Sequence, residues 1–108
     1  MHLLSRSEEI VLLAIWKLRD NAYGVTIREE VGRLSGFPWT IGAIYAPLHR
    51  LEKKGYVKTR MGDPVRERGG RRKIFYAITE IGKQTLVKTR EIQDEVWAEI
   101  LKMGPERA

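Results

Sequence analysis

The sequence has no cysteine among its 108 residues, and this absence excludes disulfide bonds, thiolate zinc sites and thiol nucleophiles together. It also has no apolar run near the ~20 residues that a helix needs to span a bilayer. The main apolar run, residues 10–16, follows an acidic pair and has no small-residue cleavage site behind it, unlike a secretory signal. These absences predict a soluble protein of a reducing compartment, the cytoplasm.

Arrangements of catalytic residues are lacking as well. The sequence shows no paired carboxylates, no Ser/His/Asp arrangement and no phosphate-cradling glycine loop. A metal site is not expected, because the only histidines are His2 and His49 and no carboxylate lies at ligand spacing. A chain of this length forms one domain with a modest core and no deep pocket. We therefore expect no enzyme, no metal and no cofactor.

Acidic residues are scarce in one part of the chain, and their scarcity locates the positive charge. The whole chain carries a net charge of +6. Residues 40–76 contain ten Lys and Arg against three Asp and Glu, a net charge of +7, which leaves −1 for the remainder. Such asymmetry is the electrostatic footprint of a polyanion partner, a nucleic acid or an acidic membrane. A merely solvated basic face is the alternative that composition leaves open.

Two helices are predicted in the first third of the chain. Ser5 and Glu8 form a capping box in front of the apolar run, which predicts a mostly buried first helix. Asn21 can adopt the left-handed conformation that a helix end often needs. A second helix is predicted over residues 24–34, closed by Gly36 and the proline that follows.

A third helix is predicted between Thr40, a good N-cap, and Gly55, a good C-cap. One stripe of this helix is apolar and faces the core: Ile41, Ile44, Leu48 and Leu51. The opposite face is small in its first half and basic in its second: Gly42, Ala46, His49, Arg50 and Lys53. Pro47 lacks a backbone donor and crowds the carbonyl group of Ala43, which predicts a kink or a tightened turn.

The apolar period changes from 3.6 to 2 after the third helix. Residues 56–61 and 73–78 alternate between apolar and polar, which predicts a two-stranded hairpin. An 11-residue connection over residues 62–72 gives this hairpin a long cationic tip. Its Gly69-Gly70 pair permits positive φ, and its arginines can bind phosphate oxygens or enter a minor groove.

A last helix is predicted from residue 80 to about residue 103, capped by Thr79 and stopped by Gly104. At 1.5 Å per residue it would be ~36 Å long, too long for a small domain to cover. Its second half carries a broad apolar arc: Ile92, Val96, Trp97, Ile100, Leu101 and Met103. Exposed apolar surface of this extent indicates a partner.

This order of elements is the plan of a winged helix-turn-helix, mainly α with a small β-hairpin (α+β). The third helix is then the candidate for the DNA major groove, which admits one α-helix. The small residues Gly42, Ala43 and Ala46 would let its backbone approach the bases, although they could equally be plain packing residues. Arg50 would contact guanine with two hydrogen bonds and His49 a base with one.

Three blocks of the sequence resemble the PadR-type winged-helix transcriptional regulators over residues 8–86. Tyr23-Gly24 resembles the family's Tyr-Gly signature, and GAIYAPLHRLEKKGYV (residues 42–57) its recognition-helix pattern. GGRRKIFYAITEIG (residues 69–82) resembles its wing and the entry to its last helix. Two positions depart from the pattern: Ala46 intervenes before Pro47, and Phe75 replaces a common wing tyrosine.

The resemblance implies a homodimeric bacterial regulator, in most members a repressor, whose C-terminal helix makes most of the dimer contact. The implied units are a DNA-binding domain over residues 1–79 and a dimerisation helix over residues 80–108, packed as one compact structure. The residues expected to contact DNA are Tyr23, Thr40, Gly42, Ala43, Tyr45, Ala46, His49, Arg50, Lys53, Arg68, Arg71, Arg72 and Lys73. Those expected at the dimer interface are Ile92, Val96, Trp97, Ile100 and Leu101.

Some short members of that family bind planar aromatic molecules between aromatic side chains at the dimer centre. Trp97 is the candidate for such an effector contact, and a plain interface tryptophan is the alternative. Two other functions remain open for the same fold. A protein–protein module would not need the charge of residues 40–76, and an RNA-binding wing would need a stacking platform of aromatic side chains.

Overall fold

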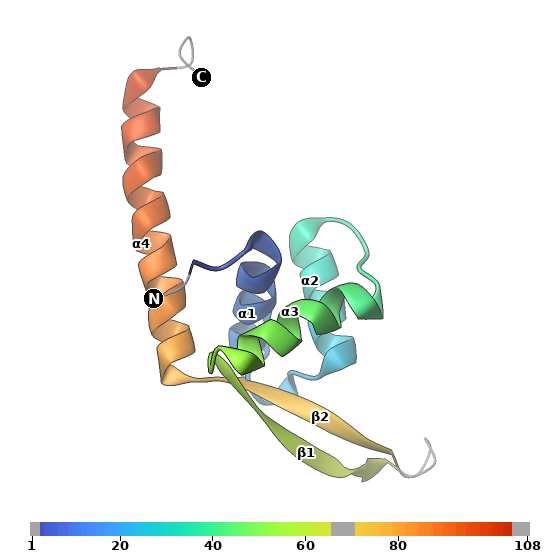
Figure 1. Ribbon diagram of the computed structural model, residues 1–108. Helices are drawn as coiled ribbons and strands as arrows, with labels where there is room; N and C mark the ends of the chain where they lie inside the picture. The colour runs from blue at the N-terminus through green and yellow to red at the C-terminus, as the bar shows by residue number, and fades with distance from the viewer. Residues whose placement is uncertain (1–2, 66–70, 105–108) are drawn as a thin grey trace.

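Four helices and one antiparallel hairpin follow one another in the predicted order, which confirms the α+β winged-helix class. The computed structural model describes residues 3–65 and 71–104, and of residues 63–65, 71 and 72 only the backbone. The helices are α1 (Arg6–Leu18), η1 (Arg19–Asn21, a 3-10 turn), α2 (Gly24–Ser35), α3 (Ile41–Lys53) and α4 (Glu80–Met103). The strands are β1 (Val57–Val65) and β2 (Arg71–Ile78) (Figure 1).

The predicted capping box starts α1. The Glu8 N–H donates to Ser5 Oγ at 3.1 Å, and the Ser5 N–H donates to Glu8 Oε1 at 2.8 Å. The end of α1 differs from the prediction, because the residue with positive φ is Arg19, at φ 53° and ψ −119°, and not Asn21. The Arg19 N–H still bonds the Ile15 carbonyl, and the same residue begins the 3-10 turn, so the chain leaves α1 at this position.

The core lies between α1, α2 and α3. Its largest fully buried side chains include Leu12 and Ile15 of α1, Ile27 of α2 and Leu48 of α3. On α3 the predicted stripe is buried except at Ile41, which is 39% exposed because the first turn of α3 extends past the core. Pro47 is buried in that stripe, and α3 continues through it without interruption.

The hairpin is longer than the alternating pattern predicted. Pairing runs from Val57↔Ile78 to Val65↔Arg71, with an irregularity in register between Met61 and Pro64. The 11-residue connection predicted over residues 62–72 is therefore wrong at both ends, since cross-strand pairing continues through a glycine and a proline that looked like strand ends. Residues 66–70, which include Arg68, lie outside the described residues.

A single bridge ties the hairpin to the start of α2. Tyr23 pairs with Phe75 in an antiparallel bridge, and the Tyr76 N–H donates to the Ala22 carbonyl at 2.8 Å. The segment before α2 thus adds a third, very short edge to the sheet beside β2. The bridge and this hydrogen bond thus join the start of α2 to β2.

The last helix, α4, stands away from the body of the molecule (Figure 1). Its base is anchored by Thr79, whose Oγ1 accepts from the Gly82 N–H at 3.1 Å, and by Gly82, where a Cβ would overlap the Tyr56 carbonyl. From Arg90 to Met103 every residue is exposed, and the molecule measures 59 × 28 × 20 Å. Among the described residues, none of the helices has the length and apolar content needed to cross a membrane.

Candidate nucleic-acid interface

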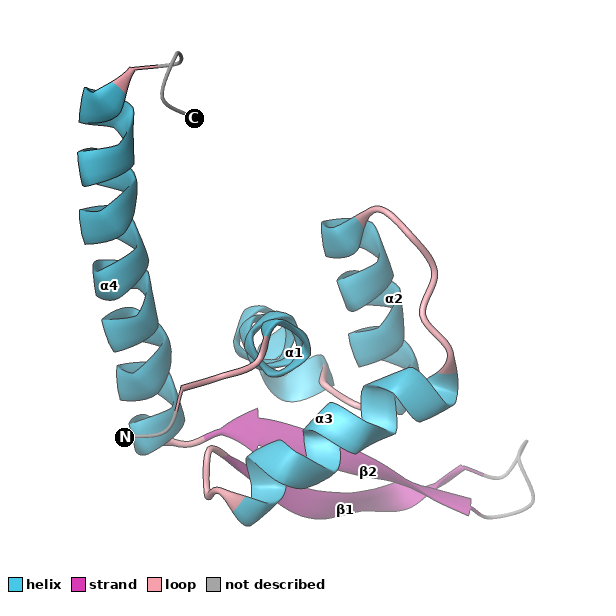
Figure 2. Ribbon diagram, turned by 45° about the horizontal axis from the view of Figure 1, so that its top comes forward, coloured by secondary structure: helices cyan, strands magenta, loops and turns pink. Residues whose placement is uncertain are grey.

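Helix α3 presents one uncovered face beside the hairpin (Figure 2). Thr40 caps it, since Thr40 Oγ1 accepts from the Ala43 N–H at 3.1 Å. While α1 and α2 contact its buried stripe, the side chains predicted to meet DNA are exposed: Gly42, Ala43, Tyr45, Ala46, His49, Arg50 and Lys53. An exposed helix face of small residues that becomes basic at one end has the shape and charge of a major-groove element.

Gly42 lies at the most open point of this face. A Cβ built on Gly42 would meet nothing within 4 Å, in contrast to the crowded glycines at positions 24, 62 and 82. The fold therefore does not require glycine there. Glycine at this position leaves the backbone of α3 open to close approach from outside.

The ring of Tyr45 accounts for the glycine of the Tyr-Gly pair at the start of α2. A Cβ on Gly24 would lie 2.8 Å from Tyr45 Oη and 3.5 Å from its Cζ, so the tyrosine ring lies directly over the first residue of α2. Tyr45 is 46% exposed, and the ring thus bridges the exposed face of α3 and the start of α2. The sequence placed Tyr45 and Tyr23 in one predicted site but gave no sign that Tyr45 packs on the glycine after Tyr23.

Two aromatic rings, each with a cation over it, lie where the hairpin meets the start of α2. The Tyr23 and Phe75 rings meet edge to face, with centroids 5.4 Å apart. The Arg60 guanidinium lies 4.4 Å from the Phe75 centroid, and Lys73 Nζ lies 4.2 Å from the Tyr23 centroid. Each contact contributes roughly 0.5–1 kcal/mol at an exposed site. The row Arg60–Phe75–Tyr23–Lys73 was not predicted, because Tyr23 lies outside both strands and joins Phe75 only through a long-range bridge.

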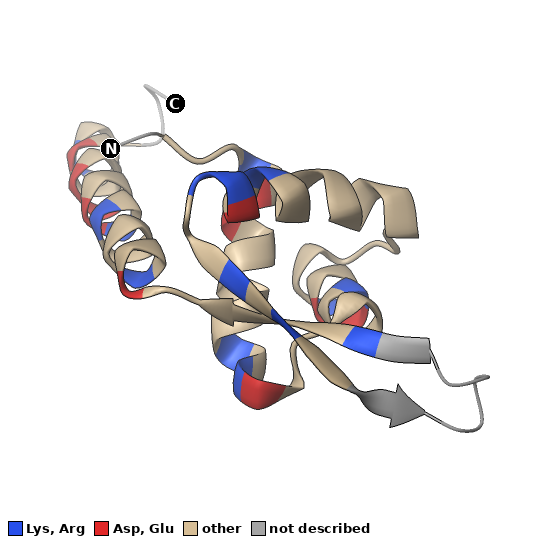
Figure 3. Cartoon of the chain, turned by 60° about the horizontal axis from the view of Figure 1, so that its bottom comes forward, with Lys and Arg blue, Asp and Glu red and all other residues tan. Residues whose placement is uncertain are grey.

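The charged side chains described on the hairpin are all cations. Within residues 57–62 and 73–78, Lys and Arg occur at three positions and Asp or Glu at none (Figure 3). Lys58 and Arg60 are exposed, and Lys73 is half-buried. Of the other predicted wing contacts, Arg71 and Arg72 are described as backbone of β2 only.

The junction between α3 and the hairpin is closed. Thr59 Oγ1 donates to Glu52 Oε2 at 3.4 Å, and Tyr76 is buried beneath it. Burial raises the pKa of Tyr76, with smaller contributions from Tyr45 and Glu52. The helix and the hairpin are therefore in contact and adjoin on one surface.

Arg50 is held by a buried carboxylate from α1. Its Nε donates to Glu8 Oε2 at 3.0 Å, and Lys54 Nζ donates to the same oxygen at 2.9 Å. Burial alone would raise the pKa of Glu8, but hydrogen bonds from Lys54, the Ser5 N–H and Arg50 together lower it to about 2. The sequence identified Glu8 only as a helix cap, because its partners lie 42 and 46 residues away.

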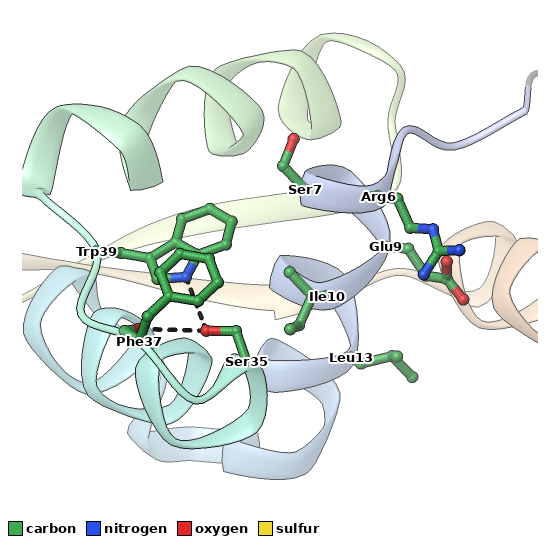
Figure 4. A pocket seen from close by; sticks show the side chains of 8 residues that line it. All are labelled: Arg6, Ser7, Glu9, Ile10, Leu13, Ser35, Phe37 and Trp39. Atoms are coloured by element: carbon green, nitrogen blue, oxygen red, sulfur yellow. Dashed lines mark hydrogen bonds between the residues drawn. The ribbon is translucent and has the colours of Figure 1, made fainter.

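A separate apolar hollow of about 520 Å³ lies between α1 and the loop that joins α2 to α3 (Figure 4). Phe37 and Trp39 stack in one wall with centroids 5.6 Å apart, and Trp39 Nε1 donates to Ser35 Oγ at 2.9 Å. Ile10 and Leu13 of α1 face them from the other side. None of the predicted DNA contacts lines this hollow.

The predicted dimer residues form an exposed stripe on α4. Ile92, Val96, Ile100 and Met103 are 40–47% exposed, and beside them Trp97 and Leu101 are 59% and 74% exposed. They lie far along the part of α4 that leaves the body (Figure 1). Within residues 3–65 and 71–104, no three His, Asp or Glu side chains gather as metal ligands.

Known proteins of one family share the sequence pattern and the fold of this chain. The profile of the Transcriptional regulator PadR-like family matches residues 12–88. A comparison with curated protein sequences finds no match.

Several solved structures share the fold. A PadR family transcription regulator from Clostridium difficile R20291 is 27% identical, with a TM-score of 0.66 over 92% of this chain and 94% of that chain. A PadR-like transcription factor from Bacteroides fragilis is 18% identical, with a TM-score of 0.76 over 90% and 88% of the two chains. A PadR-like transcriptional regulator from Bacillus cereus is 19% identical, with a TM-score of 0.70 over 89% and 88%.

Proposed function

The chain belongs to the transcriptional regulator PadR-like family, and from this premise we propose that it represses transcription by binding duplex DNA sequence-specifically as a homodimer. One observation carries the proposal. The uncovered face of α3 and the cationic hairpin adjoin on one surface, joined at Thr59 and Glu52. Such a surface matches a major groove and the phosphates that flank it.

In this proposal α3 enters the major groove. Thr40 and the small residues Gly42, Ala43 and Ala46 allow close approach, while His49 and Arg50 contact base edges. Tyr45 lies at one edge of this face and Lys53 at its C-terminal end, and both flank these contacts. The hairpin then places Lys73 and Tyr23 beside phosphates, with Arg68, Arg71 and Arg72 proposed as further phosphate contacts.

The apolar stripe of α4 is proposed as the dimer interface. Its residues are exposed in the single chain, and a large exposed apolar patch is characteristic of a protein–protein contact. Dimers of this type bind two half-sites ~34–36 Å apart, one helical turn of DNA. The proposed interface residues are Ile92, Val96, Trp97, Ile100 and Leu101.

Selection from a pool of random duplexes tests the proposal. The protein should enrich a sequence with two related halves, and log K on the enriched duplex should fall with log salt at a slope of about −5 to −9 for ~6–10 phosphate contacts. A slope near zero would remove the electrostatic basis of the proposal. Stronger competition by single-stranded RNA than by duplex DNA would favour the RNA-binding alternative.

Two lysines offer a matched comparison of position. Lys53→Gln and Lys73→Gln each remove one charge from the proposed surface, and each should reduce the slope by about 0.9 per protomer, because one phosphate is no longer neutralised. Lys102→Gln removes the same charge from the last turn of α4 and should leave the slope unchanged. Equal effects of all three changes would contradict the assigned surface.

We also propose Trp97 as the contact for a planar aromatic effector. Its side chain is 59% exposed and lies in the middle of the proposed dimer interface, where two copies could enclose a flat molecule. Acridine should quench tryptophan fluorescence in the wild type and lower the affinity for the selected duplex. In Trp97→Phe both effects should be lost. Quenching that persists through Trp16 and Trp39 would contradict this role.

A further inference from the structure

The carboxyl group of Glu8 lies where the first turn of α1 meets the last turns of α3. Its side chain is 3% exposed and receives three donors: the Ser5 N–H at 2.8 Å, Arg50 Nε at 3.0 Å and Lys54 Nζ at 2.9 Å. A buried carboxylate with this many partners has a single orientation, because moving it would leave charges unpaired. The carboxylate therefore restricts the positions of Arg50 Nε and Lys54 Nζ, the two cationic groups bonded to it.

Arg50 is held by one particular nitrogen. Glu8 takes Nε, while the side chain remains 46% exposed and its Nη2 lies 3.5 Å from Ser7 Oγ, at the limit of hydrogen bonding. Glu8 thus holds the guanidinium by Nε and not by its outer edge, the one formed by Nη1 and Nη2. Two N–H groups in a fixed fork are what bidentate contact with guanine O6 and N7 requires.

We propose that Glu8 is a positioning residue for DNA recognition: it holds Arg50 by Nε so that the Nη edge meets a base, and it holds Lys54 so that this cation does not contact phosphates indiscriminately. The inference rests on the proposed function. It adds a residue of α1, outside the DNA-contacting surface, as a determinant of specificity. Specificity is the ratio of the affinity for the selected sequence to the affinity for other sequences. Fixing Arg50 raises the first affinity, and keeping Lys54 away from phosphates lowers the second, so both increase the ratio.

Glu8→Gln tests the proposal with little change in shape. Glutamine at the third position of α1 preserves the capping box, since its side-chain oxygen also accepts from the Ser5 N–H. The change leaves Arg50 and Lys54 without their counter-charge. Random-pool duplex selection should then show the preference at one position of each half-site falling at least ~5-fold, the smallest effect of removing one bidentate base interaction. The salt slope on random duplex should steepen by up to about 2 per protomer as the released cations meet phosphates.

Glu30→Gln is the matched control. Glu30 also holds two cations, Lys17 at 2.9 Å and Arg33 at 2.6 Å, and its side chain is only 12% exposed. The charge change is the same, but Glu30 lies on α2 and its partners are not among the proposed DNA contacts. Glu30→Gln should leave the selected sequence unchanged. If both variants alter selection equally, the effect is one of net charge and the proposal is wrong.

A measurement on the wild type avoids the risk that Glu8→Gln does not fold. In ¹H–¹⁵N spectra the Arg50 Nε–H should be protected from exchange in the free protein, and it should stay protected in the complex with the selected duplex. Loss of that protection on binding would show that Glu8 releases Arg50, and would overturn the proposal. If the wild type selects no sequence at all, the proposed function fails; if it selects one that Glu8→Gln selects equally well, only this inference fails.

Discussion

At the scale of single residues, the Glu8 carboxylate links stability to pH as well as orienting Arg50. Its pKa is about 2 in the folded protein against an ordinary 4.5, so the unfolded state binds a proton more readily. A depressed pKa contributes stability that is complete above pH ~4.5 and is lost as the pH falls towards 2. We expect wild type to exceed Glu8→Gln in free energy of unfolding by about 3 kcal/mol more at pH 6 than at pH 2.

Urea unfolding of both proteins across this pH range measures the effect. The difference between them is the relevant quantity, because Glu30 also has a pKa of about 2 and titrates in both proteins. A difference that is constant between pH 6 and pH 2 would contradict the buried ion pairs of Glu8. High salt at pH 6 should weaken the effect only partly, since the carboxylate is buried.

The contact between Gly24 and Tyr45 is a second residue-scale feature that can be tested. Gly24→Ala places a methyl group 2.8 Å from Tyr45 Oη, but 3.5 Å from Cζ, which is an ordinary contact. In a Tyr45→Phe background, Gly24→Ala should therefore stabilise the protein by about 0.4–1 kcal/mol through the unfolded state. In the wild-type background the gain should disappear, because the tyrosine ring must move. Equal changes in melting temperature in both backgrounds would contradict the contact.

At the scale of elements, the hairpin depends on a glycine that its strand pattern treats as a break. Gly62 is buried under Phe75, and a Cβ there would lie 2.5 Å from Phe75 Cε2 and 3.3 Å from the Lys73 carbonyl oxygen. Gly62→Ala should displace the ring from Tyr23 and Arg60 at a cost of about 1–3 kcal/mol. Faster hydrogen exchange at the amides of residues 57–61 and 74–78 would report the loosened hairpin.

Gly42→Ala is the control for that prediction. A Cβ at Gly42 meets nothing within 4 Å, so the same substitution should stabilise α3 by about 0.5–1 kcal/mol. Its hydrogen exchange should not quicken. If it nevertheless weakens binding to the selected duplex, the glycine serves close approach to DNA and not the fold. Gly62→Ala with unchanged exchange would contradict the packing of Phe75.

Helix starts were predictable from the sequence, whereas strand ends were not. Ser5, Thr40 and Thr79 cap their helices through bonds that span three residues, and such local interactions appear directly in the sequence. The strands continue past Gly62 because pairing partners from the other strand outweigh the local preference. Ile41 fits the apolar stripe of α3 and is nevertheless exposed, because helical periodicity indicates a face of the helix but not where the core ends along it.

At the scale of the whole molecule, the candidate site combines residues that only the fold brings together. The sequence indicated α3 and the hairpin as a basic surface, because their charge is concentrated in one third of the chain. It could not indicate that Glu8 holds Arg50 across 42 residues, or that Tyr23 bridges to Phe75. Both contacts depend on how α1 and α2 dock, and one sequence carries no record of such pairings.

The exposed part of α4 leads to a prediction for the assembly. Ile100 and Val96 lie one turn apart on the apolar stripe and are 40% and 47% exposed in the single chain. Val96→Asp combined with Ile100→Asp should leave the protomer folded, because neither side chain belongs to its core, but should abolish a dimer that buries them. Sedimentation equilibrium should give 12.5 kDa for the variant and twice this mass for the wild type. Glu91→Gln together with Glu95→Gln alters charged positions of α4 without adding charge to the stripe and should remain dimeric.

Because a monomer engages one half-site, the variant with Asp at positions 96 and 100 should also bind the selected duplex far more weakly than the wild type. Its salt slope should fall by about half. A variant that still sediments at twice the chain mass would place the dimer interface elsewhere than on this stripe.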